Sequence, residues 1–532
     1  MRIWSRLRTY GQASLVMAAF ALSVTLSGCT RESGPGTAET LETDGTSAPA
    51  EEPEIPPFPG TSADGSGSSP GKPMEGADGE GTEHGTGDGS DAEPDDGSES
   101  GRETDGTHGH DASEDDRDPD EDDEDAVEYQ WIENIIIATD IHYLSPSLQD
   151  GGERFREMEL YGEGQIISYI DQVTDAFLEE VISLRPNALI LSGDLTLNGE
   201  KQSHEELAEK LYQVEEAGVP VLVIPGNHDI NNKQAARYVG RQRQPTEYTT
   251  PEEFREIYRD FGYDEAISED ARSLSYVYQL DENTRFLMLD TCQYRPVAKV
   301  GGAILSPTYD WIEDQLEWAW ADDVDVIPVA HHNLLEESQV YVDNCTIEHS
   351  EQLVEILEAW DVNIFLSGHL HVQHHMRSDG KWGIWELVTS SLATPVCQYG
   401  VLDYRDDQSF TYKTWTVDVE GWAKRHGVTT PELLEFNKFK GPFLRKIFYN
   451  QSMGALDAFY GISKEEKEQM SQLYAELNYY YYQGTAYQIR DQVEKDPAYA
   501  LWMEKGVLSV LGDYVMYIMD DAVQDYNFAQ ED

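Results

Sequence analysis

The sequence predicts an α/β fold, either a sandwich or a sheet covered by helices, followed by a helical region. From about Glu128 onward, short apolar segments alternate with amphipathic segments whose apolar residues recur at helical spacing. Such alternation is typical of strands and their covering helices. From Gly421 onward the pattern is helical. The chain has 532 residues, which is enough for two or three domains with sizeable cores.

Six short apolar segments are expected to form buried strands. They span residues 134–139, 188–192, 221–224, 285–289, 324–330 and 363–367. Amphipathic segments between them are expected to form helices, with Pro and Gly marking several of their ends. These helices are expected around residues 173–184 before Pro186, around 207–214 before Gly218, after Ser306-Pro307, and around 353–360.

Residues 1–28 are expected to be a signal peptide rather than part of the fold. Three arginines precede an apolar run from Ser14 to Leu26, which is shorter than the ~20 residues of a membrane span. The run ends in Leu-Ser-Gly-Cys at Cys29, which resembles the bacterial lipobox, whose cysteine carries a diacylglycerol after cleavage. A plain signal peptide or an uncleaved N-terminal helix is the alternative. We expect the remaining chain to lie outside the cytoplasm, anchored to the bacterial cell membrane through the lipid on Cys29.

Residues 29–126 are expected to be an acidic, disordered linker. Between Thr30 and Asp125 the chain carries 31 acidic and 4 basic residues, and Phe58 is the only aromatic residue there. Such a segment cannot bury enough apolar surface to offset its chain entropy. The linker is interpreted either as a tether that holds a domain away from the membrane or as an inert, solubilising spacer.

The net charge of −65 limits the classes of partner. Nucleic acids and anionic membrane surfaces attract proteins through clustered Lys and Arg, so neither is expected to bind this chain directly.

The cysteines do not indicate a disulfide framework. Once Cys29 is set aside, Cys292, Cys345 and Cys397 remain. Their odd number and spacing favour ordinary buried thiols over disulfides or a metal site.

Potential ligands follow five of the expected strands, where α/β sheets place their chemistry. They are Asp140-Ile141-His142, Gly193-Asp194, Gly226-Asn227-His228-Asp229, His331-His332 and Gly368-His369-Leu370-His371. Each pattern alone is more typical of a capping or hydrogen-bonding residue than of a ligand. Together they offer carboxylate, imidazole and carboxamide groups without a thiolate. This set suits two ions of Mn, Fe or Zn that share one bridging carboxylate.

The order of these motifs resembles the calcineurin-like metallophosphoesterases, whose pattern is D-x-H, G-D, G-N-H-[DE], H and G-H-x-H. The resemblance covers residues 140–371 and includes the stretches 193–200 and 224–229, which look like a bacterial branch related to cyclic-nucleotide phosphodiesterases. It implies a four-layer α/β/β/α sandwich over residues 127–420. A helical C-terminal domain over residues 421–532 would follow, as is frequent in that branch.

The same resemblance implies roles for individual residues. One metal would be held by Asp140, His142 and His371, and the other by Asn227, His331 and His369, with Asp194 bridging the two. Water activated between the ions would attack phosphorus in line. His228, beside a ligand but not itself one, would donate a proton to the leaving group or hold a phosphoryl oxygen.

One position departs from the family pattern. Members usually carry Pro two residues after the histidine of the fifth motif, and here Asn333 stands there. The choice of His331 over His332 as the ligand therefore depends on its position directly after the strand. Four other histidines receive no role and are expected at the surface or behind the ligands: His204, His349, His374 and His375.

The helical region carries its own signals. Ser463 and Glu466 form a capping-box pattern, which predicts a helix start. Apolar residues then recur at helical spacing at Met470, Leu473, Leu477 and Tyr481. The many tyrosines of this region could line a ligand groove above the metals, but packing between helices is the favoured interpretation.

The function expected from these features is hydrolysis of a small phosphodiester, similar to a cyclic nucleotide, by a dinuclear metal centre outside the cytoplasm. A phosphomonoesterase or nucleotidase is the alternative within the enzyme class. The alternative outside that class is a non-catalytic lipoprotein that binds phosphate compounds. Such a protein would be expected to have lost ligands, and all seven are present in the sequence.

Overall fold

The computed structural model describes residues 132–531, with gaps at residues 297, 341, 381–382 and 507–508. These residues belong to one compact unit. The expected signal peptide, Cys29 and the whole of the expected linker lie outside the described residues.

Within the described part, six strands form a first sheet in the order β15-β14-β13-β1-β2-β3. Three of them, β1, β2 and β3, are parallel, whereas β13, β14 and β15 continue the sheet in antiparallel fashion. The strands are β1 (Ile132–Ala138), β2 (Ala188–Leu191), β3 (Val221–Val223), β13 (Gln398–Arg405), β14 (Phe410–Thr416) and β15 (Phe528–Glu531). β1, β2 and β3 coincide with expected strands because their side chains are apolar on both faces.

A second described sheet has the order β11-β12-β10-β9-β8-β7-β6. Its centre is parallel, from β8 through β9 and β10 to β12, and its edges are antiparallel. The strands are β6 (Ser268–Glu269), β7 (Tyr276–Gln279), β8 (Thr284–Leu289), β9 (Asp325–Ala330), β10 (Ile364–Ser367), β11 (His374–Arg377) and β12 (Trp385–Val388). β8, β9 and β10 are the remaining three expected strands.

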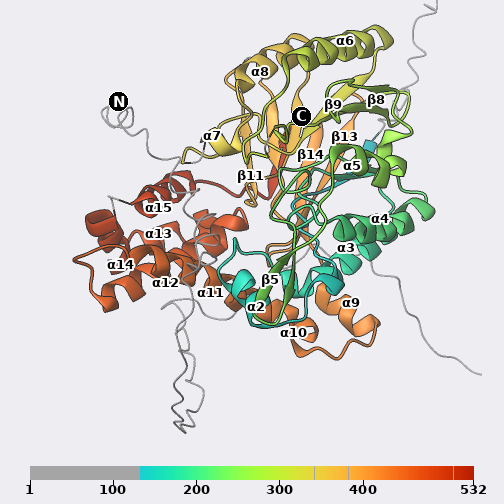
Figure 1. The fold of residues 1–532 in the computed structure, drawn as a ribbon. Coiled ribbons are helices and arrows are strands. Elements are labelled where there is room, and N and C mark those ends of the chain that lie inside the picture. Colours follow the sequence, from blue (N-terminus) through green and yellow to red (C-terminus); the bar gives the residue numbers. More distant parts are fainter. Residues whose placement is uncertain (1–131, 297, 341, 381–382, 507–508, 532) are drawn as a thin grey trace, which may run out of the picture. The chain divides into compact units, whose positions relative to one another are not determined.

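The two sheets pack face to face between helices. Along β8, Phe286 and Met288 belong to the core shared with the first sheet, whereas Leu287 and Leu289 belong to a separate core under helices α6 (Ser306–Asp322) and α8 (Ser350–Ala359). The outer face of the first sheet is covered by α3 (Ile170–Leu184) and α4 (Lys201–Glu216). Figure 1 shows these two pairs of helices on opposite sides of the strands. The predicted α/β/β/α sandwich is confirmed.

The four expected covering helices are present, and α4 begins at Lys201, six residues before the range expected for it. α6 has Pro307 in its first turn, which suits the fixed φ of proline. α3 ends at Arg185, whose left-handed backbone (φ 51°) turns the chain immediately before Pro186. Several short elements in loops had no counterpart in the prediction: α2 (Glu153–Leu160), α5 (Pro251–Ile257), α7 (Val342–Cys345), η3 (Pro146–Leu148), η4 (Ile167–Tyr169), η5 (Arg259–Tyr263) and the hairpin of β4 (Ala236–Val239) and β5 (Gln242–Pro245).

The region after β14 is helical and has its own core. Met470, Leu473, Leu477 and Tyr481 are all buried in it, together with Trp502. The capping box at Ser463 and Glu466 is present. Because the apolar face of this helix is buried in the core, its role is packing between helices. The helices are α9 (Val419–Arg425), α10 (Pro431–Leu434), α11 (Phe436–Leu456), α12 (Lys464–Tyr482), η6 (Ala486–Gln488), α13 (Arg490–Val493), α14 (Pro497–Leu501), η7 (Trp502–Gly506) and α15 (Val510–Asp521).

The end of the described chain returns to the sandwich. Strand β15 pairs antiparallel with β14, with Tyr412 opposite Ala529. The sequence analysis did not predict this strand, because four residues with one buried apolar side chain carry too weak a pattern. The pairing attaches the helical region to the first sheet at both of its ends.

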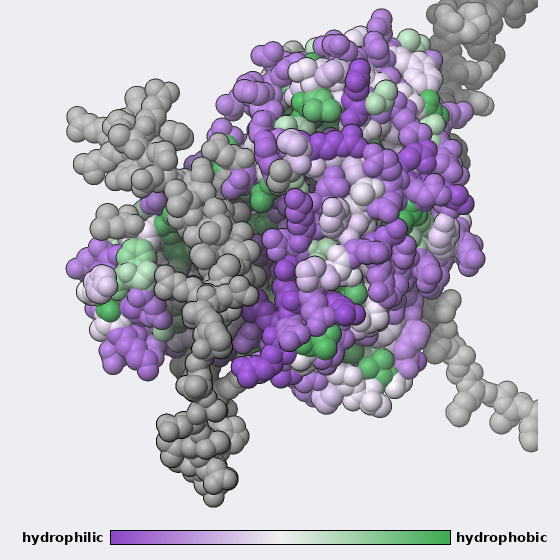
Figure 2. All heavy atoms as spheres, in the orientation of Figure 1, coloured by the Kyte–Doolittle hydropathy of each residue, from purple (hydrophilic) through white to green (hydrophobic). Residues whose placement is uncertain are grey.

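The visible face of the described residues is mainly hydrophilic, with small hydrophobic patches scattered over it (Figure 2). Within residues 132–531, none of the helices combines the length and the apolar character that crossing a membrane requires.

Candidate metal centre

Side chains from five strand ends meet at the carboxyl edge of the two sheets. They are Asp140 and His142 after β1, Asp194 after β2, Asn227 and His228 after β3, His331 after β9, and His369 and His371 after β10. Parallel strands deliver the residues that follow them to a common edge, so side chains far apart in sequence become neighbours. The structure brings all seven predicted ligands together.

The backbone at this edge is strained. Five of the predicted ligands have left-handed backbones with φ between 46° and 68°: Asp140, His142, Asp194, His369 and His371. For residues with a side chain, such conformations cost about 1–3 kcal/mol each, and they persist only where the surrounding structure enforces them. Here the enforcing contacts include Asp140 N–H donating to Gly193 O (3.0 Å) and His142 N–H donating to Asp194 O (2.9 Å). The strain indicates a site whose geometry is fixed before any ligand arrives.

Asp140, His142 and His371 form the first half of the site. The Nε2 atoms of His142 and His371 lie 3.0 Å apart, and Asp140 Oδ1 is 3.2 Å from His371 Nε2 and 3.8 Å from His142 Nε2. The other carboxylate oxygen of Asp140 accepts hydrogen bonds from Thr139 Oγ1 (2.9 Å) and His369 N (3.0 Å). Asp140 and His142 are completely buried. Three ligand atoms therefore converge in a dry pocket.

Asp194 lies between the two halves. Its Oδ2 is 4.0 Å from His142 Nε2 on one side and 3.4 Å from His331 Nε2 on the other. Its Oδ1 accepts the backbone N–H of His228 (2.7 Å), which fixes the orientation of the carboxylate. This is the position that a bridging ligand requires.

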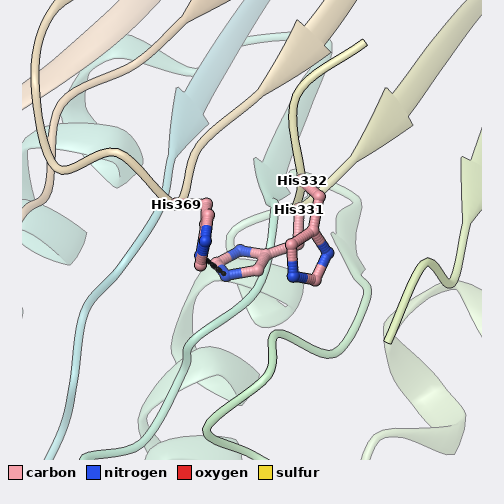
Figure 3. Close-up of side chains that lie close together, drawn as sticks. All are labelled: His331, His332 and His369. Atoms are coloured by element: carbon pink, nitrogen blue, oxygen red, sulfur yellow. Dashed lines mark hydrogen bonds between the residues drawn. The ribbon is translucent and has the colours of Figure 1, made fainter. Parts of the chain in front are cut away.

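The second half is formed by His331, His369 and Asn227. His331 Nε2 lies 3.2 Å from His369 Nδ1, along the dashed line in Figure 3, and 3.2 Å from Asn227 Oδ1. The opposite ring nitrogens face backbone carbonyls: His331 Nδ1 faces Ser192 O (2.9 Å) and His369 Nε2 faces Asn344 O (2.9 Å). Because a carbonyl oxygen only accepts, the nitrogens that face carbonyls donate to them, which leaves His331 Nε2 and His369 Nδ1 as the nitrogens directed into the site.

The neighbouring His332 is engaged elsewhere. Its Nε2 donates to Val300 O (2.8 Å) and its Nδ1 lies 2.7 Å from Thr291 Oγ1. Figure 3 shows His331 between His332 and His369. Proximity alone groups all three histidines, but both nitrogens of His332 have partners outside the site, which leaves His331 and His369 as the pair whose ring nitrogens converge. The geometry therefore favours His331 over His332 as a ligand.

His228 stands beside the site without joining either group of converging ligand atoms among the described residues. Its Nδ1 lies 2.7 Å from Leu197 O and donates to it, which leaves Nε2 directed toward Asp194 Oδ2 at 4.0 Å. Its side chain is 27% exposed, in contrast to the buried ligands. Burial lowers the pKa of His228, but the charge of Asp194, other nearby carboxylates and the hydrogen bond to Leu197 O together raise it above its usual value. The imidazole at the edge of the site thus holds a proton more readily than a free histidine does.

The histidines of the centre differ in pKa because burial and nearby carboxylates act on them to different extents. Burial lowers the pKa of His142 to about 3 and that of His369 to about 4, so both rings are neutral. Burial opposes the charge on His331 too, but Asp194 raises its pKa to about 9. For Asp140, burial raises the pKa, but the charge of His371, the hydrogen bond with His371 and the charge of His331 together lower it further and hold the carboxyl ionised. The carboxylates thus attract positive charge into the site, and His331 would give up its proton on becoming a ligand.

Asp229 is a functional residue that the sequence analysis left without a role. Its carboxylate accepts hydrogen bonds from the backbone N–H groups of Leu195 (3.0 Å), Thr196 (2.9 Å) and Gly226 (2.8 Å). It therefore ties the loop of Asp194 to the loop of Asn227. Burial raises the pKa of Asp229 to about 6. Its place as the last residue of Gly-Asn-His-Asp was the available signal.

Asn333, the departure from the family pattern, connects two ligand loops. Its Nδ2 donates to Ser367 Oγ (3.1 Å) and to Gly368 O (3.2 Å), directly before His369. A proline could not make these contacts, since it has no side-chain donor. Where family members carry a rigid proline, this chain thus has Asn333, which is held by side-chain hydrogen bonds.

The four histidines without a predicted role occupy different environments. His349 is exposed, as expected for a surface residue. His204 is buried behind the ligand loops, where its Nε2 lies 3.1 Å from both Thr196 Oγ1 and Asp229 O. His374 and His375 are buried between the sandwich and the helical region.

The arrangement fits metal ions. Asp140 Oδ1 is completely buried and makes no hydrogen bond with the described residues, so it remains available as a ligand. On each side of Asp194, two ring nitrogens face each other at 3.0–3.2 Å. Once the rings are deprotonated, the facing nitrogens of each pair can offer their lone pairs to one cation. Imidazole, carboxylate and carboxamide donors suit Mn, Fe or Zn.

A separate pocket of about 260 Å³ lies at the opposite ends of β9 and β10, among Asp325, Asn363, Trp320 and Trp360. It contains none of the predicted ligands and plays no part in this centre.

Two family models match the chain. Residues 133–373 match the calcineurin-like phosphoesterase model, and residues 418–525 match the model described as the C-terminal domain of cyclic nucleotide phosphodiesterase. A "probable cyclic nucleotide phosphodiesterase" of Synechococcus sp. is 26% identical over 187 residues, which are 35% of this chain and 58% of that protein. A protein of the same description from Ruthia magnifica is 42% identical over 55 residues, or 10% of this chain and 22% of that protein. The matched segments span less than two thirds of either relative.

Among solved structures, a dimetal phosphatase from Danio rerio is 12% identical with a TM-score of 0.37, and the match covers 54% of this chain and 99% of that one. A purple acid phosphatase from yellow lupin seeds is 15% identical with a TM-score of 0.36, covering 54% of this chain and 52% of that one.

Proposed function

The chain belongs to the calcineurin-like phosphoesterase family through residues 133–373, and on this basis we propose that it hydrolyses a small phosphodiester, similar to a cyclic nucleotide, at a dinuclear metal centre. The observation that carries the proposal is the convergence of seven ligand side chains on two adjoining positions with Asp194 between them. The choice of a diester is supported by the C-terminal domain model and by the relatives described as probable cyclic nucleotide phosphodiesterases.

The proposed ligand sets follow the geometry. Asp140, His142 and His371 would hold one ion, and Asn227, His331 and His369 would hold the other. Asp194 would contribute to both. When bound, the ions supply positive charge to the phosphoryl oxygens and lower the pKa of water, which is the chemistry that phosphoester hydrolysis needs.

The protein's own groups orient and protonate the substrate. The hydrogen bond from His228 Nδ1 to Leu197 O fixes the ring so that Nε2 faces the ligands. In the protonated state, which Asp194 stabilises, Nε2 can give its proton to the leaving oxygen of the ester. Asp229 keeps the loops of Asp194 and Asn227 in register, so that the ligands and the proton donor share one fixed frame.

We further propose that the enzyme is a lipoprotein outside the cytoplasm, anchored through Cys29. The support is the basic and apolar pattern of residues 1–28 with its Leu-Ser-Gly-Cys ending. In this arrangement the acidic linker separates the enzyme from the membrane.

The test of the proposed function is a substrate panel. Purified residues 126–532, loaded with Mn, Zn or Fe, are assayed on cyclic nucleotides, linear diesters and monoesters. We expect the highest kcat/KM on a diester. Preference for monoesters would identify a phosphomonoesterase, and binding without turnover of any ester would identify a phosphate-binding protein.

A further inference from the structure

A buried cluster of charged side chains joins the sandwich to the helical region. At its centre is His374, the first residue of β11, whose side chain is 4% exposed. Its Nδ1 forms a short ion pair with Glu337, and its Nε2 lies 3.1 Å from Asp521 Oδ1. The two carboxylates therefore contact opposite edges of one ring and do not converge on a shared ion. The cluster is formed by these three residues, Glu337, His374 and Asp521.

Each member belongs to a different part of the molecule. Glu337 follows β9 in the segment that carries His331, and it is completely buried. His374 lies three residues after His371. Asp521 is the last residue of α15 in the helical region. The cluster thus connects both ligand segments of the second sheet to one helix end.

Aromatic residues of the helical region complete the contacts. The ring of Tyr526 packs on His374 with centroids 4.1 Å apart, and its hydroxyl donates to Asp521 Oδ1 (2.9 Å). The hydroxyl of Tyr517 donates to the backbone carbonyl of Glu337 (2.6 Å). The helical region therefore contacts the His331 segment directly as well as through His374.

Further hydrogen bonds lead from the cluster region to the ligands. Glu386, also buried, accepts the backbone N–H groups of Leu334 (2.8 Å) and Leu335 (2.6 Å), which follow His331, and the hydroxyl of Ser367 (2.6 Å), which precedes His369. Gln373, two residues after His371, donates its backbone N–H to Tyr482 O (3.2 Å). A shift of the helical region would therefore displace the backbone beside three ligands.

The charges of the cluster depend on one another. Burial works against a charge on His374, but Glu337 and Asp521 raise its pKa to about 10, so the ring is a cation between two carboxylates. Removal of one partner leaves a buried charge without compensation, which is strongly destabilising for the local arrangement. Hence a single neutral substitution should displace the segments that the cluster joins.

We propose that Glu337, His374 and Asp521 are positioning residues through which the helical region holds the His331 and His369–His371 segments in their metal-binding geometry. The helical region then has a function at the metal centre without contributing a ligand. The prediction for turnover depends on the proposed phosphoesterase function, whereas the prediction for metal affinity does not.

The test uses the mature full-length chain and Asp521→Asn, which keeps the shape and removes the charge. We expect the affinity for Mn²⁺, measured by titration calorimetry, to fall about 10-fold, the lower end of what loss of a group supporting metal ligands typically costs. On an aryl phosphodiester we expect kcat to fall by a similar factor with KM little changed. The matched control is Asp520→Asn, the same change at the exposed neighbour, which should behave as the wild type.

Two further variants separate positioning from folding. Tyr526→Phe removes only the hydroxyl that orients Asp521 and should weaken Mn²⁺ binding less than Asp521→Asn does. His374→Gln should weaken it at least as much; if this variant does not fold, Asp521→Asn and Tyr526→Phe decide. A lowered melting temperature with wild-type Mn²⁺ affinity and kcat in Asp521→Asn would overturn the proposal. Weakened Mn²⁺ binding in a protein whose wild type hydrolyses no ester would uphold it and refute the proposed function instead.

Discussion

His228 differs from its neighbours in that it faces the ligands while remaining partly open to solvent. Its Nδ1 donates to Leu197 O and its backbone N–H donates to Asp194 Oδ1, so the ring is fixed. Its Nε2 is directed toward Asp194 Oδ2, which lies 4.0 Å away. A residue fixed in this way is suited to transfer a proton rather than to hold a metal.

Substitution of His228 by Ala should preserve both metals and reduce turnover. The expected loss in kcat is roughly 10²–10⁴-fold on an alkyl ester, the range for a positioned general acid. The loss should shrink for nitrophenyl esters, because nitrophenolate leaves without protonation. Parallel assays on the two esters, with metal analysis of each preparation, measure this. Equal losses on both esters, or loss of metal, would mean that His228 holds a phosphoryl oxygen or acts as a ligand.

The residues of the site divide by how far the sequence could reveal them. Asp140, His142 and His371 were expected at one edge because each follows a short apolar strand, and their assignment to one ion came from the resemblance to the family. His331 was preferred to His332 from its position directly after a strand, and the hydrogen bonds of the two rings supply the physical reason for that choice. Asp229 and Asn333 act through backbone groups of other loops, and the left-handed conformations of the ligands leave no mark in residue type. These features depend on tertiary contacts.

At the scale of elements, the central strands were predicted closely and the connections were not. β8, β9 and β10 are continuous apolar runs, and burial on both faces leaves few alternatives for such sequences. β15 and β11 are short and partly polar, and they form because a neighbouring strand offers a free edge. Their pairing is a property of the folded sheet rather than of their own residues.

The helical region should not be separable from the sandwich. Truncation after Glu420 removes β15 from the edge of β14 and also removes Tyr526 and Asp521, the partners of Gln373 and His374. We therefore expect residues 126–420 to be insoluble or unfolded, as judged by gel filtration and circular dichroism. A soluble, active fragment with a raised KM for a cyclic nucleotide would instead assign the helical region to the substrate pocket.

The buried cation of His374 predicts a pH dependence of stability. Glu337 and Asp521 face its two nitrogens, Tyr526 packs on its ring, and His375 packs on Tyr526. The pKa of His374 is raised from 6.5 to about 10, so its contribution to stability is complete below pH 6.5 and is lost as the pH rises toward 10. In metal-free protein, the melting-temperature difference between wild type and His374→Gln should therefore be largest at or below pH 6.5 and shrink by pH 10. A constant difference would show that His374 is neutral throughout.

At the scale of the whole molecule, the chain combines a proposed N-terminal address, an acidic segment and a compact unit that carries the candidate metal centre. The first two parts were interpreted from composition and from a four-residue pattern, and they lie outside the described residues. The charge of −65 is consistent with this separation of roles, because it disfavours direct association with anionic surfaces while leaving a metal centre free to attract phosphate locally.

Cys29→Ala tests the proposed address. Without the thiol no diacylglycerol can be attached. On detergent phase partitioning we therefore expect the wild type in the detergent phase and the mutant in the aqueous phase, and the mass of the mutant should lack the lipid. Deletion of residues 30–125 serves as the companion experiment and should leave kcat and KM on small esters unchanged. Unchanged partitioning and mass in Cys29→Ala would refute lipidation at this residue.

The central claim is that seven side chains form one centre for two metal ions with Asp194 shared between them. The most direct measurement is the number of metal ions per chain, by mass spectrometry of the elements, in residues 126–532 and in the same chain with Asp194→Ala. We predict two ions per chain in the wild type. The mutant should hold at most one and lose ester hydrolysis with it, because two cations lose their shared negative ligand and repel each other. A wild type with one ion or none, or a mutant that retains two, would contradict the account.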